Sequence, residues 1–178
     1  ALIDFIPTEQ GMALKDVCSF TKHCGGAPIN IAAATAKLGA HSKVLTQVGA
    51  DAFGDFILET LSLCQVDITA VKRTKQYPTA LAFVALDEKG NRDFTFYRDP
   101  CADLHLSAED ITATMFQDCG ILHFCSVDLV DSPMKQAHLK AIQLAKEQGA
   151  IISFDPNVRL PLWSSKEDCK NTILEFAP

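Results

Sequence analysis

Three short apolar runs, each next to a segment with helical periodicity, most constrain what this chain can fold into. They lie at residues 44–48, 121–125 and 151–154. Apolar strands that alternate with helices are typical of a parallel sheet covered on both faces, because the helical crossovers bury both sides of the strands. The sequence therefore predicts an α/β fold in which helices sandwich a parallel sheet.

Periodicity and turn residues predict the remaining elements. Helices are expected at about residues 28–38, 52–63, 132–148 and 164–176. Pro28 near the start of the first helix and Gly39 just after its end are the usual helix punctuation, and Asp51 is an N-cap candidate for the second. Strands are expected at about residues 1–6, 16–23, 43–48, 68–73, 79–87, 92–98, 121–125 and 151–154.

The stretch from residue 66 to residue 98 breaks the alternation of strands and helices. Three strand-like runs follow one another there without a helix between them, so we expect them to pair antiparallel. The last two are joined by residues 87–91, a short loop that contains glycine and is typical of a hairpin. Such a ribbon commonly serves as a flap over a site or as a subunit contact.

Composition excludes several classes of protein. The chain of 178 residues is 48% hydrophobic, and its longest strictly apolar stretch, 80–86, is far shorter than the ~18 residues of a membrane helix. A net charge of −6 argues against a nucleic-acid or anionic-membrane partner. Seven cysteines, an odd number without a C-x-x-C pair, indicate reduced thiols and no structural metal site. We therefore expect a cytoplasmic protein that binds no metal through its own residues.

The first candidate binding residues lie near the N-terminus. Asp4 interrupts the apolar run 1–6, where it either accepts hydrogen bonds from ligand hydroxyl groups or caps a turn at the strand end. Gly25 and Gly26 stand between a predicted strand and a helix, so the backbone can approach a ligand closely, and Asn30 follows at the helix start. A tight turn before a close-packed helix is the structural alternative.

Two aromatic residues and an arginine share one face of the last strand in the ribbon. The strand period of two places Phe94, Phe96 and Arg98 together. An aromatic surface that ends in a guanidinium suits a sugar or a phosphate ligand. An edge-strand arginine lying over aromatic rings is the alternative interpretation.

Asn157 and Arg159 follow directly after the predicted strand at 151–154. In open α/β sheets, ligands bind outside the carboxyl ends of the strands. Arg159 is a permanently charged, forked donor that suits a transferring phosphoryl group. A simple turn formed by Asp155 and Pro156 is the alternative.

In combination, these segments resemble the ribokinase/PfkB family of carbohydrate kinases, and most closely the fructokinases. The resemblance spans the chain in order through the segments ALIDF at 1–5, GGAPIN at 25–30 and DPNVR at 155–159. The middle segment resembles the first signature of the family. The resemblance implies a ribokinase-like α/β fold with a small antiparallel β-sheet lid, formed by strands at about residues 7–24 and 68–98.

The resemblance also implies site residues, cofactors and partners. Asn157 and Arg159 would face the path of the phosphoryl group, with Arg159 as the catalytic residue that neutralises developing charge. ATP and Mg²⁺ are the implied cofactors, with most of their ligands outside this chain, and the lid is a candidate contact for a homodimer. The implied substrate-binding residues are Asp4, Gly25, Gly26, Asn30, Phe96 and Arg98.

One signature of the family is absent from these 178 residues. The Gly-Ala-Gly-Asp turn, whose Asp is the general base of the family, occurs nowhere in the sequence, and the Asn/Glu magnesium motif is absent too. We therefore expect residues 1–178 to form the sugar-binding, N-terminal portion of one ribokinase-like domain, without the C-terminal ATP-binding portion. Such a chain is expected to bind sugar at best and not to turn over ATP.

The implied reaction of the full-length protein is ATP-dependent phosphorylation of a sugar hydroxyl, with conversion of fructose to fructose 6-phosphate as the first choice. Two alternatives remain open at this point. One is a sugar-binding or regulatory homologue without catalysis. The other is a kinase for a different sugar, such as 2-keto-3-deoxygluconate or ribose.

Overall fold

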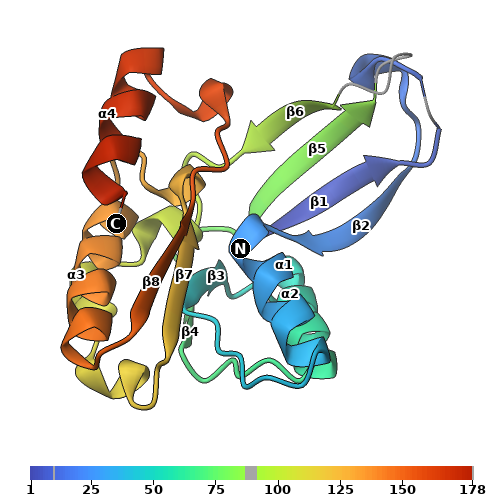
Figure 1. Ribbon diagram of the computed structural model, residues 1–178. Helices are drawn as coiled ribbons and strands as arrows, with labels where there is room; N and C mark the ends of the chain where they lie inside the picture. Colours follow the sequence, from blue (N-terminus) through green and yellow to red (C-terminus); the bar gives the residue numbers. More distant parts are fainter. Residues whose placement is uncertain (10, 87–91, 178) are drawn as a thin grey trace. The chain divides into compact units, whose positions relative to one another are not determined.

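A mixed four-stranded sheet joins the N-terminus to the middle of the sequence (Figure 1). The computed structural model describes residues 1–9, 11–86 and 92–177, and the chain divides into two units, Ala1–Asp103 and Leu104–Pro178. The sheet belongs to the first unit and has the strand order β2-β1-β5-β6. Its strands are β1 (Leu2–Pro7), β2 (Phe20–Gly25), β5 (Ala80–Leu86) and β6 (Arg92–Tyr97). The central pair, β1 and β5, runs parallel, and both outer pairs are antiparallel.

The rest of the first unit is built around a second, parallel strand pair. Strand β3 (Thr46–Gly49) pairs with β4 (Val71–Thr74), and helix α2 (Ala52–Leu63) connects them. Helix α1 (Ala27–Lys37) follows β2. The expectation that all three runs between residues 66 and 98 pair antiparallel is therefore wrong for the first run. Because a helical crossover returns the chain in its original direction, β4 pairs with β3, and β5 and β6 alone form the antiparallel ribbon.

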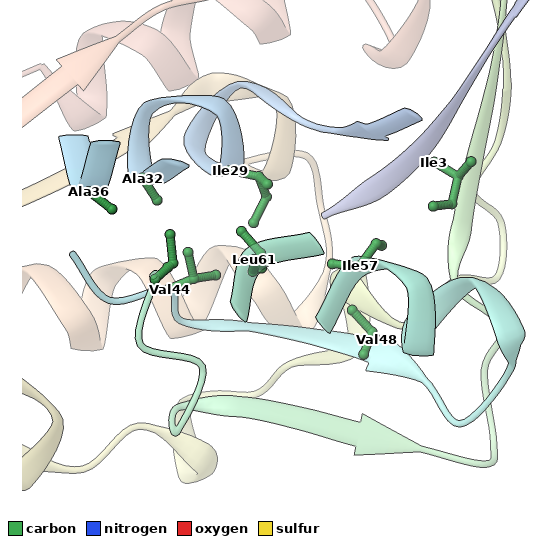
Figure 2. Close-up of a cluster of buried hydrophobic side chains, with 9 residues drawn as sticks. Ile3, Ile29, Ala32, Ala36, Val44, Val48, Ile57 and Leu61 are labelled. Atoms are coloured by element: carbon green, nitrogen blue, oxygen red, sulfur yellow. The ribbon is translucent and has the colours of Figure 1, made fainter. Parts of the chain in front are cut away.

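Small residues on α1 allow a close-packed core in the first unit. Figure 2 shows Ile29, Ala32 and Ala36 on the inner side of α1, facing Val44 and Leu61. The cluster extends over both helices and the neighbouring strands, and its buried members are Ile3, Ile29, Ala32, Ala36, Val44, Val48, Ile57, Leu61 and Val66. Methyl side chains on one helix let the other approach closely, and Ile3 near the start of β1 and Ile29 near the start of α1 belong to the same packed cluster.

The second unit repeats the strand–helix–strand arrangement. Strands β7 (Ile121–Cys125) and β8 (Ile151–Asp155) pair in parallel, α3 (Pro133–Glu147) connects them, and α4 (Lys166–Phe176) follows β8. Three aromatic residues are buried together in its core: Phe124 of β7, Trp163, which precedes α4, and Phe176 of α4. Short 3-10 helices lie at Leu14–Asp16, Asp103–His105, Ala108–Asp110, Ala113–Phe116, Ser126–Asp128 and Leu160–Leu162.

The predicted fold class is confirmed: parallel strands alternate with helices, and a small antiparallel set of strands is present. All predicted strands and helices have counterparts, and the largest shift is in β2, which begins at Phe20 because Leu14–Asp16 forms a 3-10 turn instead. The expected hairpin loop at residues 87–91 lies outside the described residues. Within the described ranges, no helix combines the length and the apolar character needed to cross a membrane.

Candidate functional site

Asp4 and Phe96 lie in one cross-strand row of the four-stranded sheet. Asp4 is paired with His23 of β2 and with Ala82 of β5, and Ala82 is paired with Phe96 of β6. Directly paired residues of neighbouring strands point to the same side of a sheet. These four residues therefore define one surface, which we call the Asp4 face. Two of the predicted substrate-binding residues thus share a face, with only the methyl group of Ala82 between them.

The absence of a side chain at Gly25 leaves room for the Asp4 carboxylate. Gly25 is buried at the end of β2, on the same face as Asp4 because it pairs with Leu2. A Cβ added to Gly25 would overlap Oδ2 of Asp4 and lie only 2.7 Å from its Cγ. The carboxylate therefore lies close against the backbone of Gly25, and only glycine leaves room for it.

Gly26 turns the chain from β2 into α1. Its φ of 105° lies in the region that favours glycine, and it is the N-cap residue of α1. Asn30 is exposed, one helical turn later, and its N–H donates to the carbonyl of Gly26 at 3.0 Å. The structure thus places Asp4 against the Gly25–Gly26 turn, with the start of α1 following directly.

Arg98 is held by a residue that sequence reasoning did not identify. It lies just after β6 and is buried, and its Nη2 donates to Oδ2 of Asp103 at 2.6 Å. The thiol of Cys101 donates to the other oxygen, Oδ1, at 2.7 Å. Arg98 is therefore enclosed in an ion pair, with only 7% of its side chain exposed. No sequence pattern marks Asp103, because its partner is set by the path of the loop after β6.

Asp51, at the start of α2, has the structural role that its N-cap position predicted. Oδ1 of Asp51 accepts hydrogen bonds from the N–H groups of Phe53 and Gly54 and from the hydroxyl of Thr79, and Oδ2 accepts from the N–H of Thr79. Burial raises the pKa of Asp51, but these hydrogen bonds outweigh it, so the pKa lies below its usual range. The carboxylate ties the start of α2 to the start of β5.

The thiol of Cys24, next to the glycine turn, is half-buried. Burial raises the pKa of Cys24 to about 11, so its thiol stays protonated at neutral pH. Across residues 1–9, 11–86 and 92–177, no group of three or more His, Cys, Asp or Glu side chains could hold a metal ion. The chemistry available on the Asp4 face is therefore hydrogen bonding by a carboxylate, an imidazole and backbone amides, with an aromatic ring beside them.

In the second unit, Asn157 and Arg159 follow the carboxyl end of β8. The N–H of Asn157 donates to Oδ1 of Asp155 at 3.0 Å, which is the turn that the structural alternative predicted, and Asn157 has a φ of 36°. The half-buried Arg159 donates from Nη1 to the carbonyl of Val158 at 3.0 Å. This turn also directs polar side chains to the sheet edge where α/β proteins bind ligands.

The ends of β7 and β8 are joined at that edge. The hydroxyl of Ser126, which follows β7, donates to the carbonyl of Pro156, which follows β8. Sequence reasoning did not single out Ser126, and its position after a buried strand is the signal that could have identified it.

Comparisons with known proteins agree with this architecture. The model of the pfkB family carbohydrate kinases matches residues 1–178. The chain is 40% identical over 175 residues to Probable fructokinase-2 of Arabidopsis thaliana, covering 98% of this chain and 53% of that protein. It is 41% identical over 172 residues to the fructokinase of Solanum tuberosum, covering 97% and 54%. The chain spans about half the length of these curated relatives.

The solved structure of the fructokinase from Xylella fastidiosa with bound ATP superposes on this chain with a TM-score of 0.86. Its sequence is 35% identical, and the match covers 97% of this chain and 54% of the solved one. The paired strands and helices described above are thus shared with a kinase that binds ATP.

Proposed function

Because the chain belongs to the pfkB family of carbohydrate kinases, we propose that the protein containing it phosphorylates a sugar, with fructose as substrate and fructose 6-phosphate as product. In this reaction the oxygen of the sugar's primary hydroxyl forms a bond to the γ-phosphorus of ATP. The bond from that phosphorus to the bridging oxygen breaks, ADP leaves, and the hydroxyl proton passes to a general base, which we expect outside these 178 residues. Similarity to several fructokinases favours fructose over other sugars.

The observation that carries the proposal is the position of Asp4 against the Gly25–Gly26 turn, on the same face as Phe96. An ionised carboxylate only accepts hydrogen bonds, so it suits a ligand that presents several hydroxyl groups. Backbone amides at the turn add donors for sugar oxygens, and the ring of Phe96 offers an apolar surface to the carbon skeleton. A sugar bound there would keep its hydroxyl groups hydrogen-bonded while part of its surface leaves water.

The second unit would serve the phosphoryl group. The guanidinium of Arg159 presents forked donors that match phosphate oxygens, and Asn157 lies two residues before it in the same turn. ATP supplies the phosphoryl group when it is bound, and its use is supported by the ATP complex of the Xylella fastidiosa fructokinase. Among the described residues, no cluster of three or more His, Cys, Asp or Glu side chains could hold Mg²⁺.

The four-stranded sheet would be the lid of this site, and its other face would pair two copies of the chain. Opposite the Asp4 face, Phe5 and Phe83 stack with ring centroids 4.9 Å apart, and Tyr97 contacts Phe83 edge-on at 5.6 Å. Phe5 and Phe83 are half-buried, whereas Tyr97 is 64% exposed, and an exposed aromatic side chain at the edge of such a row suits a protein contact. Sedimentation of wild type and Tyr97→Lys tests this part: a dimer that the substitution weakens supports it, and a monomeric wild type contradicts it.

The reaction is tested with the full-length gene product that contains this chain. ADP release is measured with ATP and a panel of fructose, ribose, glucose and 2-keto-3-deoxygluconate, and the product is identified by NMR. We expect the highest kcat/KM with fructose and phosphorylation at its 6-hydroxyl. Sugar binding by calorimetry without ADP release would instead show a binding protein, and preference for another sugar would overturn the choice of fructose.

A further inference from the structure

His23 lies directly beside Asp4 on the neighbouring strand. The two residues are paired across β1 and β2, so their side chains share the Asp4 face. His23 is exposed and Asp4 is half-buried. An exposed imidazole on a strand contributes little to the core, so packing does not account for a histidine at this position.

The hydrogen bonds around His23 are compatible with a tautomer in which Nε2 carries the proton. The hydroxyl of Thr21 donates to the carbonyl of Ile6 at 3.3 Å. The same hydroxyl oxygen lies 3.0 Å from Nε2 of His23. When the Thr21 hydroxyl donates to Ile6, its oxygen accepts from Nε2–H of His23, and in the neutral ring Nδ1 is then the acceptor.

We propose that His23 is a second hydroxyl-binding residue of the sugar site, with Nδ1 accepting a hydrogen bond from the sugar. The inference rests on the proposed function, because it assumes that the Asp4 face binds a sugar. Directly opposed residues in an antiparallel pair have Cβ atoms about 5 Å apart. Asp4 and His23 are therefore two acceptors spaced for neighbouring hydroxyl groups of one ligand, and the site selects sugars that carry both.

Thr21 acts on the sugar through His23. It lies two residues before His23 on the same face of β2, and its oxygen holds Nε2–H. Removing that oxygen frees the ring to adopt the other tautomer, in which Nδ1 is a donor. Thr21 is thus a positioning residue, and its loss should have a smaller effect than the loss of His23.

The direct test uses the full-length protein with His23→Ala, and with His41→Ala as a control. His41 is also exposed but lies outside the four-stranded sheet. We expect His23→Ala to raise the KM for fructose about three- to tenfold, as for the loss of one neutral hydrogen bond, with kcat changed by less than about twofold. His41→Ala should leave both unchanged, and an unchanged KM in His23→Ala would overturn the proposal.

Monodeoxy analogues of fructose separate a direct contact from a structural effect. Wild type should bind the analogue that lacks the contacted hydroxyl less tightly than fructose, and His23→Ala should not distinguish the two. Thr21→Val should raise the KM less than His23→Ala does. If wild type and His23→Ala discriminated equally among all analogues, the proposed contact between His23 and the sugar hydroxyl would be contradicted.

Failure of the two proposals can be told apart. If wild type releases no ADP with any sugar, the kinase proposal fails, and the affinity for each analogue by calorimetry still tests His23. If wild type phosphorylates fructose but His23→Ala matches it in KM and in analogue discrimination, only the His23 proposal fails.

Discussion

Asp103 holds the guanidinium of Arg98 through an ion pair of 2.6 Å in which the two side chains are only 1% and 7% exposed. Removing one partner of a buried ion pair leaves the other charged and without compensation, which commonly costs 3–5 kcal/mol. The pair joins the end of β6 to the loop that follows it. It therefore keeps Arg98 in one orientation near the end of the Asp4 face.

Arg98→Met should lower the free energy of unfolding by about 3–5 kcal/mol, because it removes the nearer cation from the buried Asp103 carboxylate and leaves the N-terminal ammonium, 3.6 Å away, as the other cation beside it. Denaturant unfolding measures this loss. The matched control is Arg73→Met, whose pair with Asp55 is 44% and 53% exposed and should contribute less than about 1 kcal/mol. If both variants lost the same free energy of unfolding, the buried pair would contribute no more to stability than the exposed pair.

Gly25→Ala should weaken sugar binding by about tenfold or more, because the added Cβ occupies the space of the Asp4 carboxylate and displaces it from the turn. Calorimetry with fructose measures the affinity. Gly120→Ala is the control, since a Cβ there meets no atom within 4 Å. Undiminished affinity in Gly25→Ala would mean that the position of Asp4 does not matter for the ligand.

Asp51→Asn should destabilise the protein at neutral pH by about 1–2 kcal/mol, as for the loss of an N-cap. The pKa of Asp51 is lowered in the folded state, so its contribution is fully present above the ordinary pKa of about 4 and is lost as the pH falls through the lowered value. The gap between wild type and variant should therefore close on acidification. Denaturant unfolding at a series of pH values measures this gap.

The exposed Asp16 provides a control for this experiment, because its side chain caps no α-helix. Asp16→Asn should track wild type at every pH. A gap for Asp51→Asn that stays constant down to acidic pH would contradict the role of its charged form.

Arg159→Lys should reduce kcat by at least about tenfold while changing the KM for fructose little, because lysine keeps the charge but loses the forked donors that match a phosphoryl group. Steady-state kinetics of the full-length protein measures both quantities. Arg73→Lys controls for the loss of a guanidinium elsewhere. An Arg159→Lys variant with unchanged turnover would remove Arg159 from the catalytic step.

The candidate site was predictable from sequence where a single segment carries the information. The Gly25–Gly26 turn and the N-cap Asp51 act through backbone conformation and hydrogen bonds within a few residues, so their residue types already indicate their roles. Asp103 and His23 gave no such signal. Their importance depends on neighbours that a different loop path or strand register would have removed.

The sequence by itself determined the order of strands and helices and the α/β class, because apolar periodicity and helix caps act locally along the chain. Only the tertiary structure decided which strands pair. Strand β4 joined β3 and not the ribbon, and the register of β1 with β2 and β5 brought His23, Asp4 and Ala82 into one row. The physical reason is that backbone hydrogen bonds between strands carry no residue code, so the partner and register depend on the packing of the whole unit.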